Sequence, residues 1–304
     1  MGDRVALTIA CANQKGGVGK TTTVINLATS LALGGDRVLV VDLDPQGNAT
    51  SGLGVERERL DRTVYEALID GAGFQEIIHE VPIPGLYLAP SSIALAGAEL
   101  ELVPLPMRER RLNTALAAVS DDYDVILVDC PPSLGLLTVN ALTAADGVLV
   151  PVQCEYYALE GLTQLIGTIQ LVRDHLNPDL ELEGALLTMA DARTNLSNEV
   201  AAEVRRHLGE AVYEAVIPRS VRLSEAPSHG LPIALYSPES KGAMAYARFA
   251  SEFRDRLAAS GRLGKPGAGP GRPRPPAAPA RPVMPAERTP DLHQAARRPA
   301  SVRA

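Results

Sequence analysis

The sequence has no tryptophan, only three cysteines, few aromatic residues and no long apolar run. The cysteines, Cys11, Cys130 and Cys154, are too widely spaced for a disulfide framework or a CxxC metal-binding motif. No apolar run approaches the ~20 residues that a membrane-spanning helix requires. The first residues lead directly into a strand-like run, without the apolar stretch and cleavage site of an export signal. These absences predict a soluble cytoplasmic protein in a reducing environment.

Charge and proline are unevenly distributed along the chain. Residues 261–304 contain eight Arg, one Lys and two acidic residues, a net charge of +7, together with ten of the 24 prolines. Because the whole chain carries −7, residues 1–260 carry −14. A segment with so few large apolar residues cannot bury enough surface to compensate for its ordering entropy. The sequence therefore predicts one globular domain over residues 1–260 and a disordered, basic, Pro/Gly/Arg-rich tail over residues 261–304.

Short β-branched runs alternate with longer amphipathic stretches along the predicted domain. The predicted strands occupy residues 5–12, 37–42, 86–89, 124–129, 147–153, 183–189 and 215–218. Most of them are apolar throughout, as strands covered on both faces should be. The predicted helices occupy residues 20–33, 108–120, 135–145, 159–177, 197–208 and 240–259. This alternation predicts an α/β fold: a doubly wound, mostly parallel sheet with helices on both faces.

A glycine-rich turn follows the first predicted strand and precedes the first predicted helix. Its sequence is Lys15-Gly16-Gly17-Val18-Gly19-Lys20-Thr21-Thr22. Such a turn binds phosphate, because its glycines let backbone N–H groups point inward and the helix N-terminus adds its positive end. Lys20 supplies charge to the outer phosphates, and the Thr21 hydroxyl can bind Mg²⁺. The segment predicts a P-loop nucleotide site; the alternative is a glycine-rich turn with incidental lysines.

Two predicted strands end in aspartates that should face the ligand crevice of such a sheet. Asp42 and Asp44 lie two residues apart, so both could project to the same side of the chain. One can support the Mg²⁺ shell while the other orients a water for in-line attack. Asp129 ends another apolar strand, in the form of a Walker B segment whose carboxylate holds Mg²⁺ through water. The alternative is an ordinary capped strand end, since Asp-Pro and Gln-Gly-Asn favour turns.

The run over residues 15–22 resembles the deviant Walker A box of the ParA/MinD ATPases. Further segments, at residues 46–54, 151–161 and 221–230, look like the chromosomal ParA, or Soj, branch, and the resemblance covers about residues 3–258. It implies that Lys15 reaches across a nucleotide-sandwich dimer to the partner subunit's ATP, and that Asp44 positions the attacking water. With ATP and Mg²⁺ as cofactors, the expected catalytic residues are Lys15, Lys20 and Asp44. The expected metal site comprises Thr21, Asp42 and Asp129. The expected nucleotide contacts are residues 15–22, with Met189 and Pro218 as predicted adenine contacts from their positions at strand ends.

The same resemblance implies a function in chromosome partitioning. ATP binding would close a homodimer that coats double-stranded DNA without sequence preference, and a DNA-bound partner, ParB, would stimulate hydrolysis and release the dimer. The protein would then be cytoplasmic and nucleoid-associated, with no membrane partner. The branch lacks the N-terminal helix-turn-helix domain of some plasmid relatives, and the sequence has no room for one before Val5.

DNA binding needs a local basic patch, because a domain of charge −14 is otherwise repelled by phosphate. By resemblance, Arg193 and Arg222 match the DNA-contacting arginines of the family. Three more arginines could add to the patch: Arg205, Arg206 and Arg219. The alternative is that all five are solvated partners of nearby acidic residues: Asp191, Glu199, Glu203, Glu210 and Glu214.

Other ATPases with this type of site remain as alternatives. A septum-placing ATPase of the MinD type needs a C-terminal amphipathic anchor, which the segment from Gly261 onward does not supply. A reductase iron protein should present paired cluster-ligand cysteines, and an amidoligase-type synthetase needs substrate-binding residues that the sequence does not identify. A bacterial tyrosine kinase domain should end in a tyrosine cluster, whereas the tail contains no Tyr.

Overall fold

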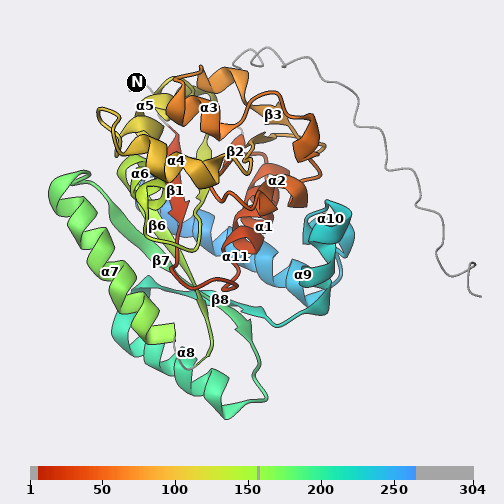
Figure 1. Cartoon of the computed structure of the whole chain (residues 1–304). Helices are drawn as coiled ribbons and strands as arrows, with labels where there is room; N and C mark the ends of the chain where they lie inside the picture. Colours follow the sequence, from red (N-terminus) through yellow and green to blue (C-terminus); the bar gives the residue numbers. More distant parts are fainter. Residues whose placement is uncertain (1–5, 156–157, 265–304) are drawn as a thin grey trace, which may run out of the picture.

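The computed structural model of the chain describes residues 6–155 and 158–264. At its centre is an eight-stranded sheet in the order β3-β4-β2-β5-β1-β6-β7-β8 (Figure 1). The strands are β1 Leu7–Cys11, β2 Val38–Asp42, β3 His79–Glu80, β4 Leu86–Ala89, β5 Val125–Asp129, β6 Gly147–Gln153, β7 Glu181–Ala190 and β8 Val212–Pro218. All pairings are parallel except that of β3 with β4. The predicted mostly parallel α/β sheet is confirmed.

Helices cover both faces of the sheet (Figure 1). They are α1 Lys20–Leu33, α2 Asn48–Gly52, α3 Val64–Ile69, α4 Leu95–Leu102, α5 Arg111–Ala117, α6 Leu136–Ala144, α7 Ala158–His175, α8 Asn195–Leu208, α9 Val221–Glu225, α10 Ile233–Tyr236 and α11 Lys241–Ala259. Successive residues of β2 enter different cores: Val38 and Val40 pack on the α1 and α11 side, whereas Leu39 and Val41 pack on the other. This alternation explains why the central strands are apolar at every position.

The short elements of the chain escaped the sequence prediction. Helices α2, α3, α4, α9 and α10 and strand β3 were not predicted, and they span two to eight residues each. Such lengths are too short for a clear hydrophobic period. The start of α3 did carry a signal, because Thr63 and Glu66 form a capping box. The helix predicted over residues 108–120 is shorter than expected, and Met107 before it has a φ of +50°.

The end of the domain lies beyond the predicted boundary at residue 260. Leu263 is only 3% exposed and belongs to the core under α1 and α11. Arg262 pairs with Glu183 at 2.5 Å, and Arg254 donates a hydrogen bond to the Gly264 carbonyl at 2.8 Å. The domain therefore continues through Gly264, and the rest of the predicted tail, residues 265–304, lies outside the described residues.

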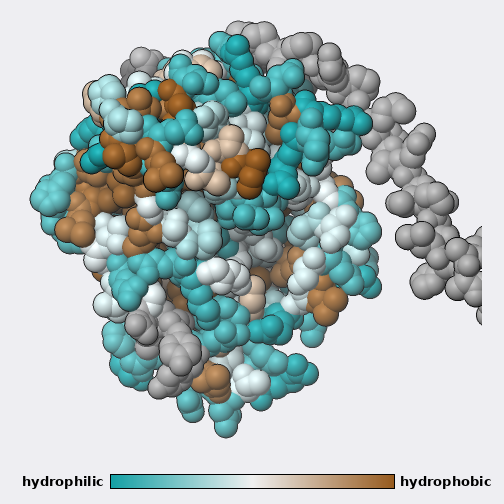
Figure 2. Space-filling model, viewed as in Figure 1, coloured by the Kyte–Doolittle hydropathy of each residue, from teal (hydrophilic) through white to brown (hydrophobic). Residues whose placement is uncertain are grey.

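Most of the visible surface is hydrophilic, as the negative charge of the domain leads one to expect (Figure 2). Apolar side chains gather where α4 and α5 lie in the same view (Figures 1 and 2). The segment around α4 exposes four large apolar side chains: Ile93, Leu100, Val103 and Met107. Within residues 6–155 and 158–264, no helix combines the length and the apolar character needed to cross a membrane.

Candidate functional site

The phosphate loop connects β1 to α1 in the middle of the sheet. Gly17 and Gly19 have φ angles of +74° and +91°, which side-chain-bearing L residues rarely adopt. Gly19 is the N-cap of α1, and no side chain caps the first N–H groups of the helix. Lys20 is buried, and its Nζ donates a hydrogen bond to the Lys15 carbonyl at 3.4 Å, so its side chain folds back along the loop. The loop therefore presents free backbone donors and one buried cation, the combination that phosphate requires.

Two buried side chains that sequence reasoning missed fix the shape of this loop. The Asn13 amide donates to the Pro151 carbonyl at 2.8 Å, and its oxygen accepts from the Lys15 N–H at 3.0 Å. The Thr188 hydroxyl donates to the Val18 carbonyl at 2.8 Å. Two of these bonds tie the loop to β6 and β7, so the sheet helps to hold the loop in its shape.

The two predicted adenine contacts lie at the ends of neighbouring strands. Met189 borders the loop, since a Cβ built on Gly19 would lie 3.9 Å from the Met189 methyl. Its φ is +51°, an uncommon value for a residue with a side chain. Pro218 ends β8, where it stands in register with Ala190 of β7. The strands thus bring Met189 next to the phosphate loop and place Pro218 one strand away, and their contact with adenine stays a prediction.

The strand ends of β2 and β5 bring two of the predicted aspartates to the level of the loop. Asp42 stands in register with Asp129, and Asp129 stands in register with Cys11 at the end of β1. The order β2-β5-β1 places Asp129 between Asp42 and the phosphate loop. The carboxylates predicted to serve Mg²⁺ therefore share one edge of the sheet with the predicted phosphate site.

Asp42 is fully buried and held by protein donors at both oxygens. One oxygen accepts from the Asp44 N–H at 3.2 Å, and the other accepts from the Thr50 N–H and hydroxyl at 2.8 and 2.7 Å. Burial raises the pKa of Asp42 to about 6, while the bonds from Thr50 act in the opposite direction. With both oxygens already bonded, Asp42 is placed to support a metal shell indirectly, by fixing the turn that carries Asp44. Sequence reasoning missed Thr50, which lies eight residues further along the chain.

The turn after β2 fixes Asp44. Its carboxylate accepts from the Gln46 N–H at 2.9 Å, an Asx-type turn, which is the local structure that the capped-strand alternative predicted. Its carbonyl accepts from the Ser91 hydroxyl at 2.5 Å, and the Ser91 N–H donates to the Thr50 hydroxyl at 3.0 Å. The bonds that close the turn therefore also fix the Asp44 side chain, close enough to Asp42 and Asp129 for its charge to act on both.

Asp129 is fully buried. Among the described residues, no donor meets both the distance and the angle of a hydrogen bond to either of its oxygens. Burial raises its pKa well above the usual range; the charge of Asp42 adds to this rise, and the Thr21 side chain and Lys20 oppose it. A buried carboxylate without a partner is costly unless a cation neutralises it. Asp129 is therefore a fitting acceptor for a metal ion or for a metal-bound water.

The donor set fits Mg²⁺ bound together with a nucleotide. No group of three or more His, Cys, Asp or Glu side chains within the described part of the chain could hold a metal alone. Mg²⁺ usually takes one or two protein oxygens, keeps several waters and completes its shell with substrate phosphates. The Thr21 hydroxyl and the Asp129 carboxylate would supply the protein oxygens, and the nucleotide would supply the rest.

Replacing Thr50 with valine is expected to lower the unfolding free energy of the nucleotide-free protein by about 1–3 kcal/mol at pH 7. The reason is the loss of a hydrogen bond to a buried, ionised carboxylate. The pKa of Asp42 is about 6 in the folded protein, against an ordinary value of 3.8, so the native state binds more protons between these values. The unfolding free energy of the wild type should accordingly fall as the pH rises from about 4 to about 6.

Urea denaturation of the Thr50→Val variant at pH 4, 5, 6 and 7 would test this expectation. The difference from the wild type should be smallest at pH 4, where the Asp42 carboxyl is protonated in both folded proteins. A difference that does not change with pH would contradict the assigned role of the Thr50 hydroxyl.

Lys15 lies in the same loop as Lys20 but in a different environment. Its side chain is 37% exposed, and its Nζ pairs with Glu155 at 3.2 Å. Glu155 follows β6, and its other oxygen accepts from Gln153 at 2.6 Å and from Arg219 at 3.3 Å. The two lysines of the loop therefore have separate partners: one is buried against the loop backbone and one is held at the protein surface.

The predicted DNA-contacting arginines are both exposed and both paired with acidic residues. Arg193 binds Asp191 through two nitrogens, at 2.9 and 2.7 Å, and its side chain is 89% exposed. Arg222 pairs with Glu225 at 2.9 Å and is 59% exposed. The alternative of solvated ion pairs thus correctly anticipated Asp191, whereas Glu225 was not among its acidic residues. Exposed pairs contribute only about 0–1 kcal/mol, so competing phosphates can displace them.

The other three arginines are less available. Arg206 pairs with Glu203, as the alternative of solvated ion pairs predicted, and Arg219 pairs with Glu155. Arg205 donates to a backbone carbonyl of β8 at 3.5 Å.

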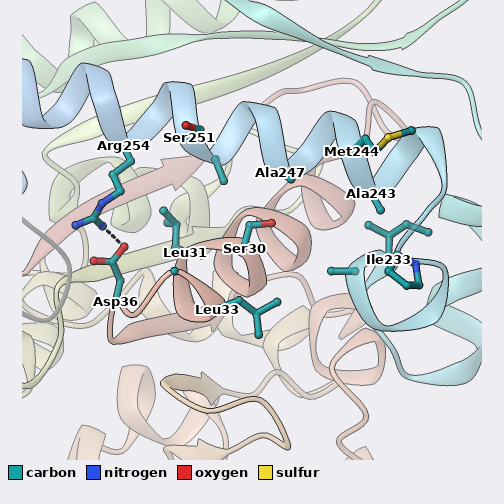
Figure 3. Close-up of a pocket in the computed structure, with 14 residues that line it drawn as sticks. Ser30, Leu31, Leu33, Asp36, Ile233, Ala243, Met244, Ala247, Ser251 and Arg254 are labelled. Atoms are coloured by element: carbon teal, nitrogen blue, oxygen red, sulfur yellow. Dashed lines mark hydrogen bonds and ion pairs between the residues drawn. The ribbon is translucent and has the colours of Figure 1, made fainter.

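An apolar groove of about 420 Å³ lies between α1, α10 and α11, away from the phosphate loop (Figure 3). Leu31, Ala243 and Ala247 point into it, and an ion pair between Arg254 and Asp36 closes one end. None of its lining residues belongs to the phosphate loop or carries one of the aspartates of the site. The groove is therefore separate from the candidate nucleotide site.

Comparison with known proteins shows the family. Residues 6–182 match the family described as AAA domain. The chain is 59% identical over 253 residues to the sporulation initiation inhibitor protein Soj of Bacillus subtilis, covering 83% of this chain and 98% of Soj. It is 54% identical over 252 residues to the chromosome partitioning protein ParA of Myxococcus xanthus, covering 83% of this chain and 89% of that protein. This chain belongs to the ParA/Soj family of chromosome-partitioning ATPases.

Solved structures of similar proteins contain nucleotide and magnesium. One is a Mycobacterium smegmatis protein named cobyrinic acid a,c-diamide synthase, solved with bound ADP and magnesium. Its sequence is 41% identical to this chain, and the two structures superpose with a TM-score of 0.74, covering 86% of this chain and 98% of that chain. Another is the septum site-determining protein MinD of Pyrococcus horikoshii, solved with Mg-ADP. It is 27% identical to this chain, with a TM-score of 0.69, covering 83% of this chain and 97% of that chain. The ParA/Soj chain thus shares its fold with proteins crystallised with ADP and magnesium.

Proposed function

We propose that this ParA/Soj chain is a Mg²⁺-dependent ATPase whose ATP-bound homodimer binds double-stranded DNA without sequence preference. A ParB-type partner stimulates hydrolysis and releases the dimer, which moves chromosome origins over the nucleoid in the cytoplasm. The separation of the two lysines carries this proposal. Lys20 is buried over its own loop, whereas Lys15 projects to the protein surface, where a second protomer can meet it.

Each residue of the site has a distinct role in the proposed hydrolysis. Lys20 and the N–H groups at the start of α1 bind the outer phosphates. Thr21 and Asp129 hold Mg²⁺, which neutralises charge on the phosphates. Asp44 orients the attacking water, and Asp42 keeps the Asp44 turn in place through its bond to the Asp44 N–H. Lys15 adds a positive charge to the nucleotide of the partner protomer, which couples hydrolysis to dimer formation.

Replacing Gly16 with valine is expected to abolish ATP-dependent dimerisation while ATP binding stays within about twofold of the wild type. Among the described residues, a Cβ at Gly16 would come within 4 Å of Pro132 alone, at 3.9 Å, so a side chain fits the isolated fold. The same side chain would project where two loops must approach each other. Light scattering after size exclusion, with a fluorescent nucleotide to follow binding, measures both quantities. Gly16→Ala should be intermediate, and a Gly16→Val variant that dimerises normally would contradict loop-to-loop contact.

The DNA contact is assigned to Arg222 and Arg193 because both are exposed and their ion pairs lie at the surface. Binding should require ATP, since a dimer doubles a basic patch that is weak in one protomer against the charge of the domain. DNA co-sedimentation with ATP, with ADP and without nucleotide, each with and without ParB, tests the proposed function. DNA binding in ADP equal to that in ATP would contradict it.

Replacing Arg222 with glutamate is expected to weaken DNA binding equally across sequences and to reduce the salt slope by about one per protomer. A suitable control is Arg62→Glu, because Arg62 is a similarly exposed arginine that pairs with Glu76 elsewhere on the surface. The control should bind DNA like the wild type. Fluorescence anisotropy over a salt series with several duplex sequences would check the result, and sequence-dependent losses would argue against a non-specific DNA coat.

One comparison favours a second candidate function. The Mycobacterium smegmatis relative is named a cobyrinic acid a,c-diamide synthase, which is an amidoligase-type activity. The higher identities to Soj and ParA support partitioning instead. ATP hydrolysis assays separate the two: DNA with ParB should raise the rate, whereas cobyrinic acid with an ammonia donor should not. The MinD-type alternative depends on an anchor in the tail, which lies outside the described residues.

A further inference from the structure

A single carboxylate just after β6 joins Lys15 of the phosphate loop to Arg219, the residue after β8. One oxygen of Glu155 binds Lys15 Nζ at 3.2 Å, and the other accepts from Arg219 Nη2 at 3.3 Å. Gln153 Nε2 donates to this second oxygen at 2.6 Å. The three donors come from the phosphate loop, from β6 and from the residue after β8, so Glu155 connects segments that are far apart in the sequence.

The pairing places Lys15 within its own protomer. Its backbone N–H is fixed by Asn13 at 3.0 Å, so the lysine side chain can move while the loop keeps its shape. The proposed function requires Lys15 Nζ to reach the phosphates of the partner's ATP. Lys15 Nζ cannot remain 3.2 Å from Glu155 and also reach the phosphates of the partner's ATP. The carboxylate and the phosphates must therefore compete for it.

We propose that Glu155 is a positioning residue that holds Lys15 in its own protomer and thereby sets how readily ATP-bound protomers dimerise. This inference rests on the proposed function and adds a regulatory contact to the same site. In the monomer, the pair with Glu155 occupies Lys15 Nζ at the protein surface. In the dimer, the multiple charges of a triphosphate outcompete the single charge of Glu155.

The other partners of Glu155 make this exchange possible. When Lys15 leaves, the carboxylate keeps its bonds to Gln153 and Arg219, so it does not become an unpaired charge. The side chain is also 44% exposed, so water can replace the lost contact. The exchange therefore opposes dimerisation only weakly, as a contact that must open in every cycle should.

Replacing Glu155 with glutamine is expected to tighten the ATP-dependent dimer by about twofold to fivefold, the range that exposed ion pairs give. Analytical ultracentrifugation with ATP, in an Asp44→Ala background to prevent turnover, measures the dimer dissociation constant. The affinity of dilute monomer for a fluorescent ATP should not change, because Lys15 does not serve its own nucleotide. At about 0.5 M salt, the dimer dissociation constants with and without Glu155→Gln should become nearly equal, since screening weakens the Lys15–Glu155 pair.

Two controls separate this contact from a general change of charge or fold. Glu155→Asp retains the carboxylate. Its dimer dissociation constant should therefore lie closer to that of the protein with Glu155 unchanged than the constant of Glu155→Gln does. Glu76→Gln removes another exposed carboxylate, one that pairs with Arg62, and it should not change dimerisation. A dimer that is unchanged or weaker in Glu155→Gln overturns the inference while the proposed function stands. Wild-type and Asp44→Ala proteins that stay monomeric with ATP overturn the proposed function itself.

Discussion

Replacing Lys20 with alanine should reduce ATP affinity by about 100-fold or more. Its buried Nζ is positioned along the phosphate loop, and charge-assisted hydrogen bonds to phosphate contribute about 1.5–3 kcal/mol each. A loss of about 2.7 kcal/mol corresponds to a 100-fold change in the dissociation constant. Isothermal titration with ATP and Mg²⁺ would measure it, and circular dichroism would show whether the variant remains folded.

The matched comparison is Lys15→Ala, which removes the same charge from the same loop. Because Lys15 pairs with Glu155 and not with the loop backbone, this variant should bind ATP within about threefold of the wild type and should fail to dimerise. Equal losses of ATP affinity in both variants would show that the two lysines serve the same nucleotide, which the account excludes.

Replacing Asp44 with alanine should lower the hydrolysis rate by about 10²–10⁴-fold, the contribution typical of a positioned general base. ATP binding should persist, because the phosphate donors lie in the loop between β1 and α1 and at the start of α1, not on the Asp44 turn. The variant should therefore accumulate as an ATP-bound dimer on DNA. Phosphate release gives the rate, and co-sedimentation with DNA gives the trapped fraction.

Asp44→Asn is the control for this variant. Its amide oxygen can still accept the Gln46 N–H, so the turn should survive while the negative charge is lost. Both substitutions should abolish hydrolysis to a similar degree. An Asp44→Ala protein that remains monomeric with ATP would contradict the dimer, and an Asp44→Asn protein with normal turnover would remove Asp44 from the reaction.

The sequence predicted the parts of the site that local patterns determine. Glycine, lysine and threonine at fixed spacing identify a phosphate loop, and apolar runs ending in Asp42 and Asp129 identify two strand ends of the crevice. The core strands and the longer helices were also predictable, since each is long enough to show its hydrophobic pattern.

The contacts that hold the site were not predictable, because they join residues far apart in the sequence. Thr188 binds the Val18 carbonyl across 170 positions, and Glu155 binds Lys15 across 140. Ser91 binds the Asp44 carbonyl across 47 positions, with no motif to mark it. A single sequence shows which residues can make hydrogen bonds but not which strand ends will meet. The domain end was misplaced for the same reason, as only the packing of Leu263 shows that the core continues.

A crystal structure with Mg²⁺ and a non-hydrolysable ATP analogue would show which nucleotide Lys15 serves. We expect two protomers facing each other through their phosphate loops, with Lys15 Nζ released from Glu155 and bound to the phosphates of the partner's nucleotide. A lone protomer, or a dimer in which Lys15 remains on Glu155 or binds its own nucleotide, would disprove the proposed role of Lys15.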